Sequence, residues 1–180
     1  MTTLIALEEL KQYLEIDDGA RDALLSVLIQ SVSSAAEIFT GRFIINRVIE
    51  EELHFFDRAA QTLQLNFYPV KQIIKIIRNG QEIDAAQIAA DKESGILRRQ
   101  YDSFCGTILV SYEAGIAQSA ADVPQDIKLA CAQWIKYFLS SDPSVKTESL
   151  GDYSVSYAEL CGGMPAQVAA VLEKYKRYGV

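Results

Sequence analysis

The single histidine, His54, and the acidic run before it are the places where this chain could do chemistry. A histidine beside a nucleophile could act in acid–base or nucleophilic catalysis, but no nucleophile lies at a recognisable spacing from His54. Glu50, Glu51 and Glu52 carry carboxylates of the kind that bind metal ions. Consecutive strand residues point to opposite faces, so at most two of these three could converge. We therefore expect a structural or surface histidine and a solvated acidic strand edge that discourages sheet aggregation.

The other polar motifs also have structural explanations. Asp122 and Asp126 lie four residues apart at the start of an expected helix, where the helix dipole favours negative charge. Gly162-Gly163 is not followed by Lys-Ser or Lys-Thr, so it does not match a phosphate-binding loop. The sequence thus predicts a protein that is not an enzyme and has no catalytic residues, metal site or cofactor. A carboxylate-dependent hydrolase is the least favoured alternative, because the acidic residues lack convergent spacing.

Length, composition and charge narrow the class of protein. The chain has 180 residues, 49% of them hydrophobic, which suits one domain or one domain with an insertion. No apolar run approaches the roughly 20 residues needed to span a bilayer, and no signal peptide pattern opens the chain. The net charge is −7, and residues 1–60 carry 5 basic and 11 acidic side chains. An acidic first third does not favour tight binding of nucleic acid, because affinity for phosphates comes from clustered basic residues.

Cysteine usage agrees with a reducing compartment. Cys105, Cys131 and Cys161 are odd in number, far apart and without metal-ligand spacing. Cys131 falls on an apolar helix face, where we expect it to act as a small hydrophobic residue. A structural disulfide is therefore not expected, and we expect a protein made and kept in the cytosol.

Residues 1–42 predict a short helix, an acidic turn and a long helix. Asp17 or Asp18 would cap the long helix, and Gly41 would end it in the left-handed conformation. The helix has an apolar stripe at helical spacing: Leu24, Leu25, Leu28, Ile29, Val32, Ala35, Ala36 and Phe39. A second apolar flank, outside this stripe, consists of Ala23, Val27 and Ile38. A helix that is apolar on two flanks is deeply buried or packed against a partner, and we interpret this flank as a subunit interface.

Residues 43–121 are typical of a small antiparallel β-sheet. Asn79-Gly80 separates two strand-like runs and predicts a hairpin turn, since both residues tolerate positive φ. No helical segments alternate with the strands, which argues against a doubly wound nucleotide-binding fold. Tyr101 and Phe104, near an expected turn, are candidates for a contact surface.

The chain then returns to helix, so the predicted fold class is α+β. Residues 122–140 form a core helix capped by Asp122, with a buried face of Ile127, Ala130, Cys131, Trp134, Ile135 and Phe138. Residues 141–164 form a loop that we expect to become ordered on assembly, with Tyr153 and Tyr157 as anchors. Residues 165–178 form a last helix that docks on a partner or packs on its own core. A small β-sheet would thus be inserted between the long first helix and the third helix in a core of three to four helices.

Six short phrases occur in a characteristic order along the chain. They are Leu7-Glu8-Glu9-Leu10-Lys11, Phe39-Thr40-Gly41-Arg42, Tyr68-Pro69-Val70, Val123-Pro124, Gly151-Asp152-Tyr153-Ser154-Val155 and the closing helix from Pro165. In this order and spacing the chain resembles the phage head–tail connector, or adaptor, family of long-tailed phages and prophages. One departure is Ala6, where a capping Thr or Ser is common, so the start of the first helix is less well defined by the pattern.

The resemblance implies a structural subunit of the virion at the head–tail junction, made in the bacterial host cytoplasm. Such subunits form a ring of about a dozen copies between the portal protein and the stopper or tail. DNA passes through the ring without sequence-specific binding, and no membrane is involved. The alternative is a small non-enzymatic protein-binding or regulatory domain that is monomeric or dimeric. The expected subunit interface comprises Ala23, Val27, Ile38, Tyr153 and Tyr157, and the expected portal contact comprises Val168, Val171, Leu172, Lys174, Tyr175, Lys176 and Arg177.

Overall fold

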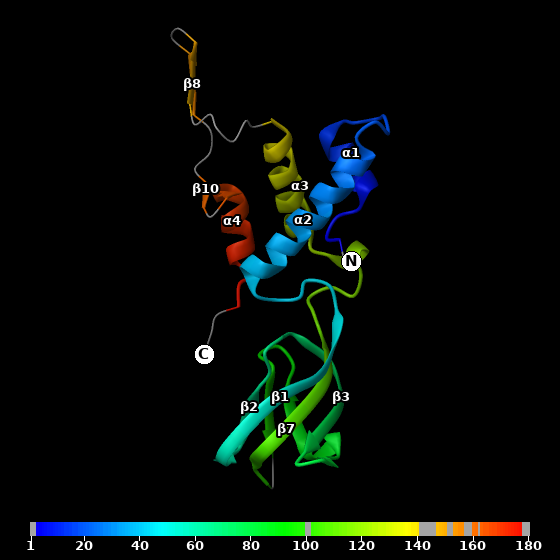
Figure 1. Cartoon of the computed structure of the whole chain (residues 1–180), viewed down its shortest axis with the longest axis vertical. Coiled ribbons are helices and arrows are strands. Elements are labelled where there is room, and N and C mark those ends of the chain that lie inside the picture. The colour runs from blue at the N-terminus through cyan, green and yellow to red at the C-terminus, as the bar shows by residue number, and fades with distance from the viewer. Residues whose placement is uncertain are drawn as a thin grey trace. The chain divides into compact units, whose positions relative to one another are not determined.

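The chain folds into two compact units, one helical and one built of β-strands (Figure 1). The computed structural model describes residues 3–99, 102–140, 147–150, 153–156, 160–161 and 163–177. The helical unit comprises residues 1–41 and 120–180, and the β unit comprises residues 42–119. The chain therefore leaves the helical unit, builds the β unit and returns. This is the α+β class that the sequence predicts.

Four α-helices form the body of the helical unit, and the last of them, red in Figure 1, packs against α3. The chain also forms a 3₁₀ turn and two short antiparallel hairpins in this unit. The bounds are α1 Leu7–Leu14, α2 Asp22–Thr40, η2 Ala120–Asp122, α3 Gln125–Ser140, β8 Thr147–Leu150, β9 Tyr153–Ser156, β10 Leu160–Cys161, β11 Met164–Pro165 and α4 Ala166–Glu173.

The long helix α2 buries one face, as its apolar stripe predicts. Leu25, Ile29 and Val32 are buried, and α2 packs against α1, α3 and α4. The predicted buried stripe is wrong at one position, since Leu24 is 49% exposed. The helix ends at Gly41, whose φ of 65° is the left-handed conformation expected of a glycine cap.

The starts of the helices differ from the predicted ones. Arg21, not Asp17 or Asp18, stands at the N-cap of α2, because the carboxylate of Asp18 instead accepts a hydrogen bond from the amide of Ala20 at 3.1 Å. At α1, the carboxylate oxygen Oε2 of Glu9 accepts a hydrogen bond from the amide of Ala6 at 3.2 Å. A glutamate on the third helical residue thus satisfies one backbone donor where the cap residue has no polar side chain.

Helix α3 buries most of its predicted face but not all of it. It begins at Gln125, and Asp122 lies in the preceding 3₁₀ turn rather than at the cap. Cys131 is buried, and burial raises the pKa of its thiol to about 12. Phe138, predicted to be buried, is 45% exposed, and its ring stacks against Trp134 at 6.2 Å between centroids.

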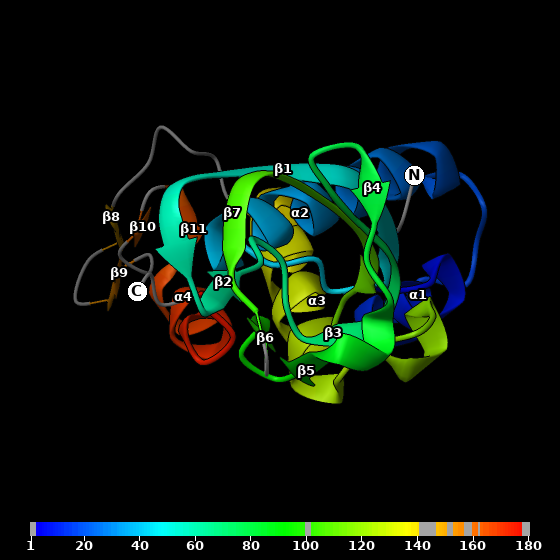
Figure 2. The same ribbon diagram turned by 90° about the horizontal axis from the view of Figure 1, so that it is seen from below.

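The β unit holds two antiparallel sheets where the sequence predicts a single small one. The four-stranded sheet has the order β1-β7-β3-β4, and the three-stranded sheet has the order β2-β6-β5. In both views β1 and β7 run side by side (Figures 1 and 2). The bounds are β1 Arg47–Ala60, β2 Thr62–Gln64, β3 Val70–Arg78, β4 Gln81–Glu82, η1 Ala85–Gln87, β5 Ile88–Asp91, β6 Ile96–Arg99 and β7 Phe104–Ala114.

The inner face of the four-stranded sheet contributes to the core of the β unit. Alternate residues of β7 are fully buried, from Phe104 through Ile108 and Val110 to Tyr112, and they pack with Leu63 and other apolar residues of both sheets. The expectation of a contact role for Phe104 is wrong, because its position in the alternation directs it inward. Asn79-Gly80 forms the predicted turn between β3 and β4, with φ of 50° and 82°.

Candidate assembly surfaces and a buried polar network

The outward face of α2 carries the flank that the sequence assigns to subunit contact. Ala23, Val27 and Ile38 are all exposed, Val27 at 60% and Ile38 at 79%. Ser31 and Ser34 lie between them on the same side and are also exposed, so small side chains separate the two apolar ends. The described part of the unit therefore leaves this helix face free, while its opposite face fills the core.

Helix α2 is long and apolar enough, by length and composition, to cross a membrane. This finding differs from the expectation that no apolar run is long enough to span a bilayer. However, a third of the apolar window is buried inside the fold, against the other helices. The core helix of a folded protein meets the same criteria, and the packing of Leu25, Ile29 and Val32 corresponds to such a helix.

The last helix packs on its own unit, which is the second of the two alternatives weighed for it. Val168 and Leu172 are completely buried, so they are not available to another protein. The expectation of a portal contact is therefore wrong for these two residues. The helix also ends at Glu173 rather than at residue 178, and the chain continues in tight turns to Arg177, whose amide donates to the carbonyl of Thr40 at 2.7 Å.

The polar residues beside this helix bind within the unit as well. The hydroxyl of Tyr175 lies 2.8 Å from a carboxylate oxygen of Asp126 on α3. Burial and this carboxylate raise the pKa of Tyr175 to about 12. Lys176 pairs with Glu173 at 3.1 Å, whereas Lys174 is exposed. Tyr175 thus fastens the end of the chain to α3, and Lys174 is the exposed cation of the predicted basic group.

An ion pair between the buried Lys128 and the exposed Glu9 joins the first and third helices. The ammonium of Lys128, which is 5% exposed, lies 2.8 Å from a carboxylate oxygen of Glu9. The hydrogen bond from Lys128 is the main reason that the pKa of Glu9 lies below its usual value. Both residues line a hollow of about 310 Å³ between α1 and α3, together with Tyr13 and Leu129. Glu9 thus makes two contacts: it pairs with Lys128 and accepts a hydrogen bond from the amide of Ala6.

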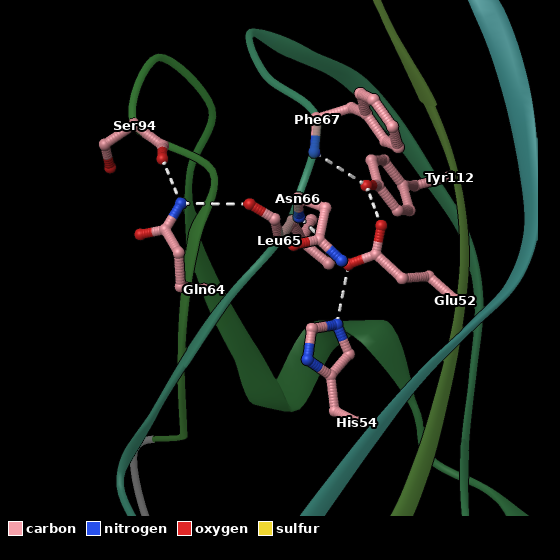
Figure 3. Close-up of polar contacts among 8 residues, drawn as sticks. All are labelled: Glu52, His54, Gln64, Leu65, Asn66, Phe67, Ser94 and Tyr112. Carbon is pink, nitrogen blue, oxygen red and sulfur yellow. Dashed lines mark hydrogen bonds and ion pairs between the residues drawn. The ribbon is translucent and has the colours of Figure 1, made fainter. Parts of the chain in front are cut away.

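The acidic run of β1 contributes one carboxylate to a buried network in the β unit (Figure 3). One oxygen of Glu52 lies 2.7 Å from Nε2 of His54 and accepts a bond from the amide of Asn66 at 2.9 Å. The other oxygen accepts a bond from the hydroxyl of Tyr112 at 2.5 Å. That hydroxyl in turn accepts a bond from the amide of Phe67 at 3.1 Å. The network fastens the loop after β2 to strands β1 and β7.

The electrostatics of Glu52 suit a structural role. Burial alone would raise its pKa, but the bonds from His54, Tyr112 and Asn66 outweigh burial and hold the pKa below the usual value. Glu50 and Glu51 are exposed, so the three glutamates do not converge. Among the described residues, no group of three histidines, cysteines or acidic residues is placed to hold a metal ion. The structural interpretation of His54 agrees with this geometry, because its contact orients a carboxylate that binds backbone.

Sequence reasoning missed a set of exposed apolar residues on β1. Val48, Leu53 and Phe55 are 57%, 65% and 73% exposed, while their neighbours Glu52 and His54 point inward. Period-two alternation is present in this strand, but it allows either face to be the buried one. The signal that could have decided it is Tyr112, a polar-tipped residue on a strand whose alternate positions are otherwise apolar.

Two predicted interface residues cannot be placed. Tyr157 lies outside the described residues, and of Tyr153 the structure describes only the backbone, which pairs with Leu150 in the β8–β9 hairpin. Strands β8 and β9 thus lie within the segment that the sequence predicts as a loop. Tyr101 also lies outside the described residues.

Comparison with known proteins identifies the family. A family model described as head completion protein matches residues 3–178, nearly the whole chain. The chain belongs to the head completion protein family. This family confirms the phage head–tail connector resemblance found in the sequence. No curated protein sequence matches the chain.

Solved structures with the same fold come from gene transfer agent particles. One, from the neck of an empty particle with C6 symmetry, has a TM-score of 0.67 at 20% identity and covers 98% of this chain and 91% of its own. Another, from the neck of a native particle with C12 symmetry, has a TM-score of 0.64 at 18% identity, covering 97% and 89%. A third, from a native virion, has a TM-score of 0.63 at 19% identity, covering 98% and 91%. At this identity the likeness concerns the fold.

Proposed function

We propose that this head completion protein is a subunit of a ring of about a dozen copies that joins the portal to the stopper or tail and surrounds the DNA path. It is made in the cytoplasm of the bacterial host and then joins the head–tail junction of the virion. The observation that carries the proposal is the exposed apolar flank of α2, formed by Ala23, Val27 and Ile38. A helix that fills the core with one face and exposes large apolar side chains on the other suits a subunit with a neighbour.

The similar structures support a ring. Two of them come from necks solved with C6 and C12 symmetry. In a closed ring each subunit contacts two neighbours through different surfaces, so every copy must bury apolar area outside its own core. The outward face of α2 offers such area, and its small residues Ser31 and Ser34 would let another element approach the helix closely.

Charge supports passage of DNA rather than its retention. The helical unit carries eight basic and fourteen acidic side chains, a net charge of −6. Tight binding of DNA requires clustered cations that release counterions from phosphates, and a negative surface repels the duplex instead. For the portal contact, Lys174 is the candidate among the predicted residues, because it is exposed whereas Val168 and Leu172 are buried.

The test introduces a charge into the α2 flank. Val27→Glu should abolish ring assembly, measured by sedimentation velocity with and without portal protein, because a carboxylate at the centre of an interface loses its hydration. Its melting temperature should stay close to that of the wild type, since Val27 lies outside the core. Gln81→Glu adds the same charge at the exposed β3–β4 turn and should leave assembly unchanged.

Two results would contradict the proposal. Rings formed by Val27→Glu as readily as by the wild type would exclude this flank as the interface. A wild-type chain that stays monomeric or dimeric at every concentration and beside its portal would favour the alternative, a small protein-binding or regulatory domain.

A further inference from the structure

The outer face of the four-stranded sheet bears a row of apolar residues, which the exposed Glu50 and Glu51 interrupt on β1. Leu53 on β1 lies opposite Leu109 on β7, and Leu109 lies opposite Ile77 on β3. Phe55 and Val48 extend the row along β1 and are the most exposed members with Leu53. We call this set, Val48, Leu53, Phe55, Leu109 and Ile77, the outer sheet face. The core of the β unit lies on the opposite side, with Ile108, Val110 and Tyr112.

Part of β1 has its polar and apolar residues on the opposite faces from those expected of a sheet with one solvated face. An antiparallel sheet with one solvated face normally turns its apolar residues to the core and its polar residues to water. Here Glu52 and His54 point inward, while Leu53 and Phe55 point outward. Strand β1 is also long, at 14 residues, and pairs with β7 alone among the described strands. Leu53 and Phe55 thus expose large apolar side chains on the solvent side of an edge strand.

The size of the outer sheet face indicates what kind of partner covers it. Three strands about 4.8 Å apart, over about six residues of roughly 3.3 Å each, give an area on the order of 300 Å². A stable interface between free partners buries about 800 Å² on each side. The face is therefore too small to hold a freely diffusing protein. It suits a partner that another contact already holds in place, which is the situation of adjacent copies in a ring.

The charges also favour another copy of the chain. The β unit carries nine basic and ten acidic side chains, a net charge of −1, against −6 for the helical unit. The nearly neutral β unit can therefore approach the helical unit of a neighbouring copy with little net repulsion. Beside the row, Thr107 and Ser111 are neutral and Lys75 pairs with Glu82 at 3.7 Å, whereas Glu50 and Glu51 are exposed and acidic.

We propose that the outer sheet face is buried against a second copy of this chain in the assembled ring. The proposal rests on the proposed function and deepens it, because a closed ring needs two different contact surfaces on every subunit. The α2 flank supplies one surface, and the outer sheet face supplies the other. The β unit is then part of the ring contact and not only an insertion.

A thiol on the same face allows a direct test with the wild-type chain. Cys105 is exposed and follows the buried Phe104 on β7, which places it on the outer side of the sheet. Iodoacetamide modification, read by peptide mass spectrometry, should slow about tenfold or more at Cys105 when subunits assemble. Cys131 is buried in the helical unit and should react slowly in both states, so it serves as the internal control.

The outcomes separate this proposal from the proposed function. Rings in which Cys105 reacts as fast as in the subunit would overturn the burial of this face and leave the ring intact as a function. Failure of any ring to form, even with portal present, would overturn both.

A matched pair of variants gives a second measurement. Phe55→Ser should lower the apparent association constant about tenfold or more, with an unchanged melting temperature, because Phe55 is 73% exposed. Leu129→Ser removes an exposed apolar residue, 46% exposed on α3, outside both proposed surfaces and should change association less than about twofold. Equal effects of the two variants, or no effect of Phe55→Ser, would contradict the proposal.

Discussion

The helical unit and the β unit solve the same packing problem in different ways. In the helical unit the apolar stripe of α2 faces the core, and polar contacts such as Glu9 with Lys128 and Tyr175 with Asp126 tie separate helices together. In the β unit a polar network occupies the inner side of β1 itself, through Glu52. The comparison indicates that a buried polar side chain, here that of Glu52, determines which face of its strand lies toward the core. Leu53 and Phe55 face outward in consequence.

Both units nevertheless leave large apolar side chains outside, at Val27 and Ile38 in one and at Leu53 and Phe55 in the other. In a monomer these residues would contribute little to stability. In the ring that we propose, they contact neighbouring copies, so both units contribute to assembly while differing in internal packing.

The largest expected effects come from truncating the separate cores. Phe104→Ala in the β unit and Leu25→Ala in the helical unit should each cost about 2–5 kcal/mol of unfolding free energy, because both side chains are fully buried. Hydrogen exchange should show the lost protection mainly within residues 42–119 for the first variant and within the helical unit for the second. Equal loss in both units for either variant would mean that they unfold as one, and the comparison would fail.

The next effect concerns the ion pair between α1 and α3. Glu9→Gln should destabilise the helical unit by about 1–3 kcal/mol, because it leaves the buried ammonium of Lys128 without its carboxylate. Denaturant unfolding measures the change. Glu8→Gln removes the same charge from the neighbouring position of the same helix while keeping the contact between Glu9 and Lys128, and it should have an effect below about 0.5 kcal/mol. Matching losses in the two variants would show that the helix dipole, not the pair, carries the effect.

A smaller change is expected in the polar network of the β unit. Tyr112→Phe keeps the buried ring but removes the hydroxyl that joins Glu52 to the amide of Phe67. We expect a loss of about 1–2 kcal/mol, since both groups lose a partner in a buried site. Tyr13→Phe, at a 37% exposed tyrosine on α1, is the control. A Tyr112→Phe protein as stable as the wild type would show that this network does not stabilise the β unit.

The pH dependence of the stability of the β unit should test the ionised state of Glu52. The pKa of Glu52 is lower in the folded chain than its usual value of 4.5, because its hydrogen bonds outweigh burial. Its contribution to stability is therefore present above about pH 4.5 and is lost as the pH falls through the lower folded pKa. Glu52→Gln should make the stability of the β unit less sensitive to pH between about 5 and 3. An unchanged slope in unfolding curves over that range would contradict the ionised state of Glu52.

The helices were largely predictable from the sequence because helical periodicity leaves a single buried face. Leu25, Ile29 and Val32 and the cap at Gly41 follow from spacing and backbone preference alone. The start of α2 was not predictable, because Asp18 has a competing local bond to the amide of Ala20. Phe138 is 45% exposed near the end of α3. Its exposure depends on how the other helices pack beside this end, which no local sequence pattern shows.

The β unit was predictable in kind but not in detail. The turn at Asn79-Gly80 follows from backbone preference, whereas the two-sheet arrangement depends on pairings between distant strands. The inward position of Glu52 depends on Tyr112, which lies 60 residues further along the chain. The assembly surface that we propose on β1 could not be found without that contact, because either face of the strand fits the alternation.

The measurement that tests the central claim most directly is the native mass of the wild-type chain across a concentration series, alone and with its portal protein. The account predicts a discrete ring species of about a dozen copies, of either this chain alone or this chain bound to portal, in equilibrium with the 20.0 kDa subunit. A chain that stays at the mass of a monomer or dimer under all these conditions would contradict it.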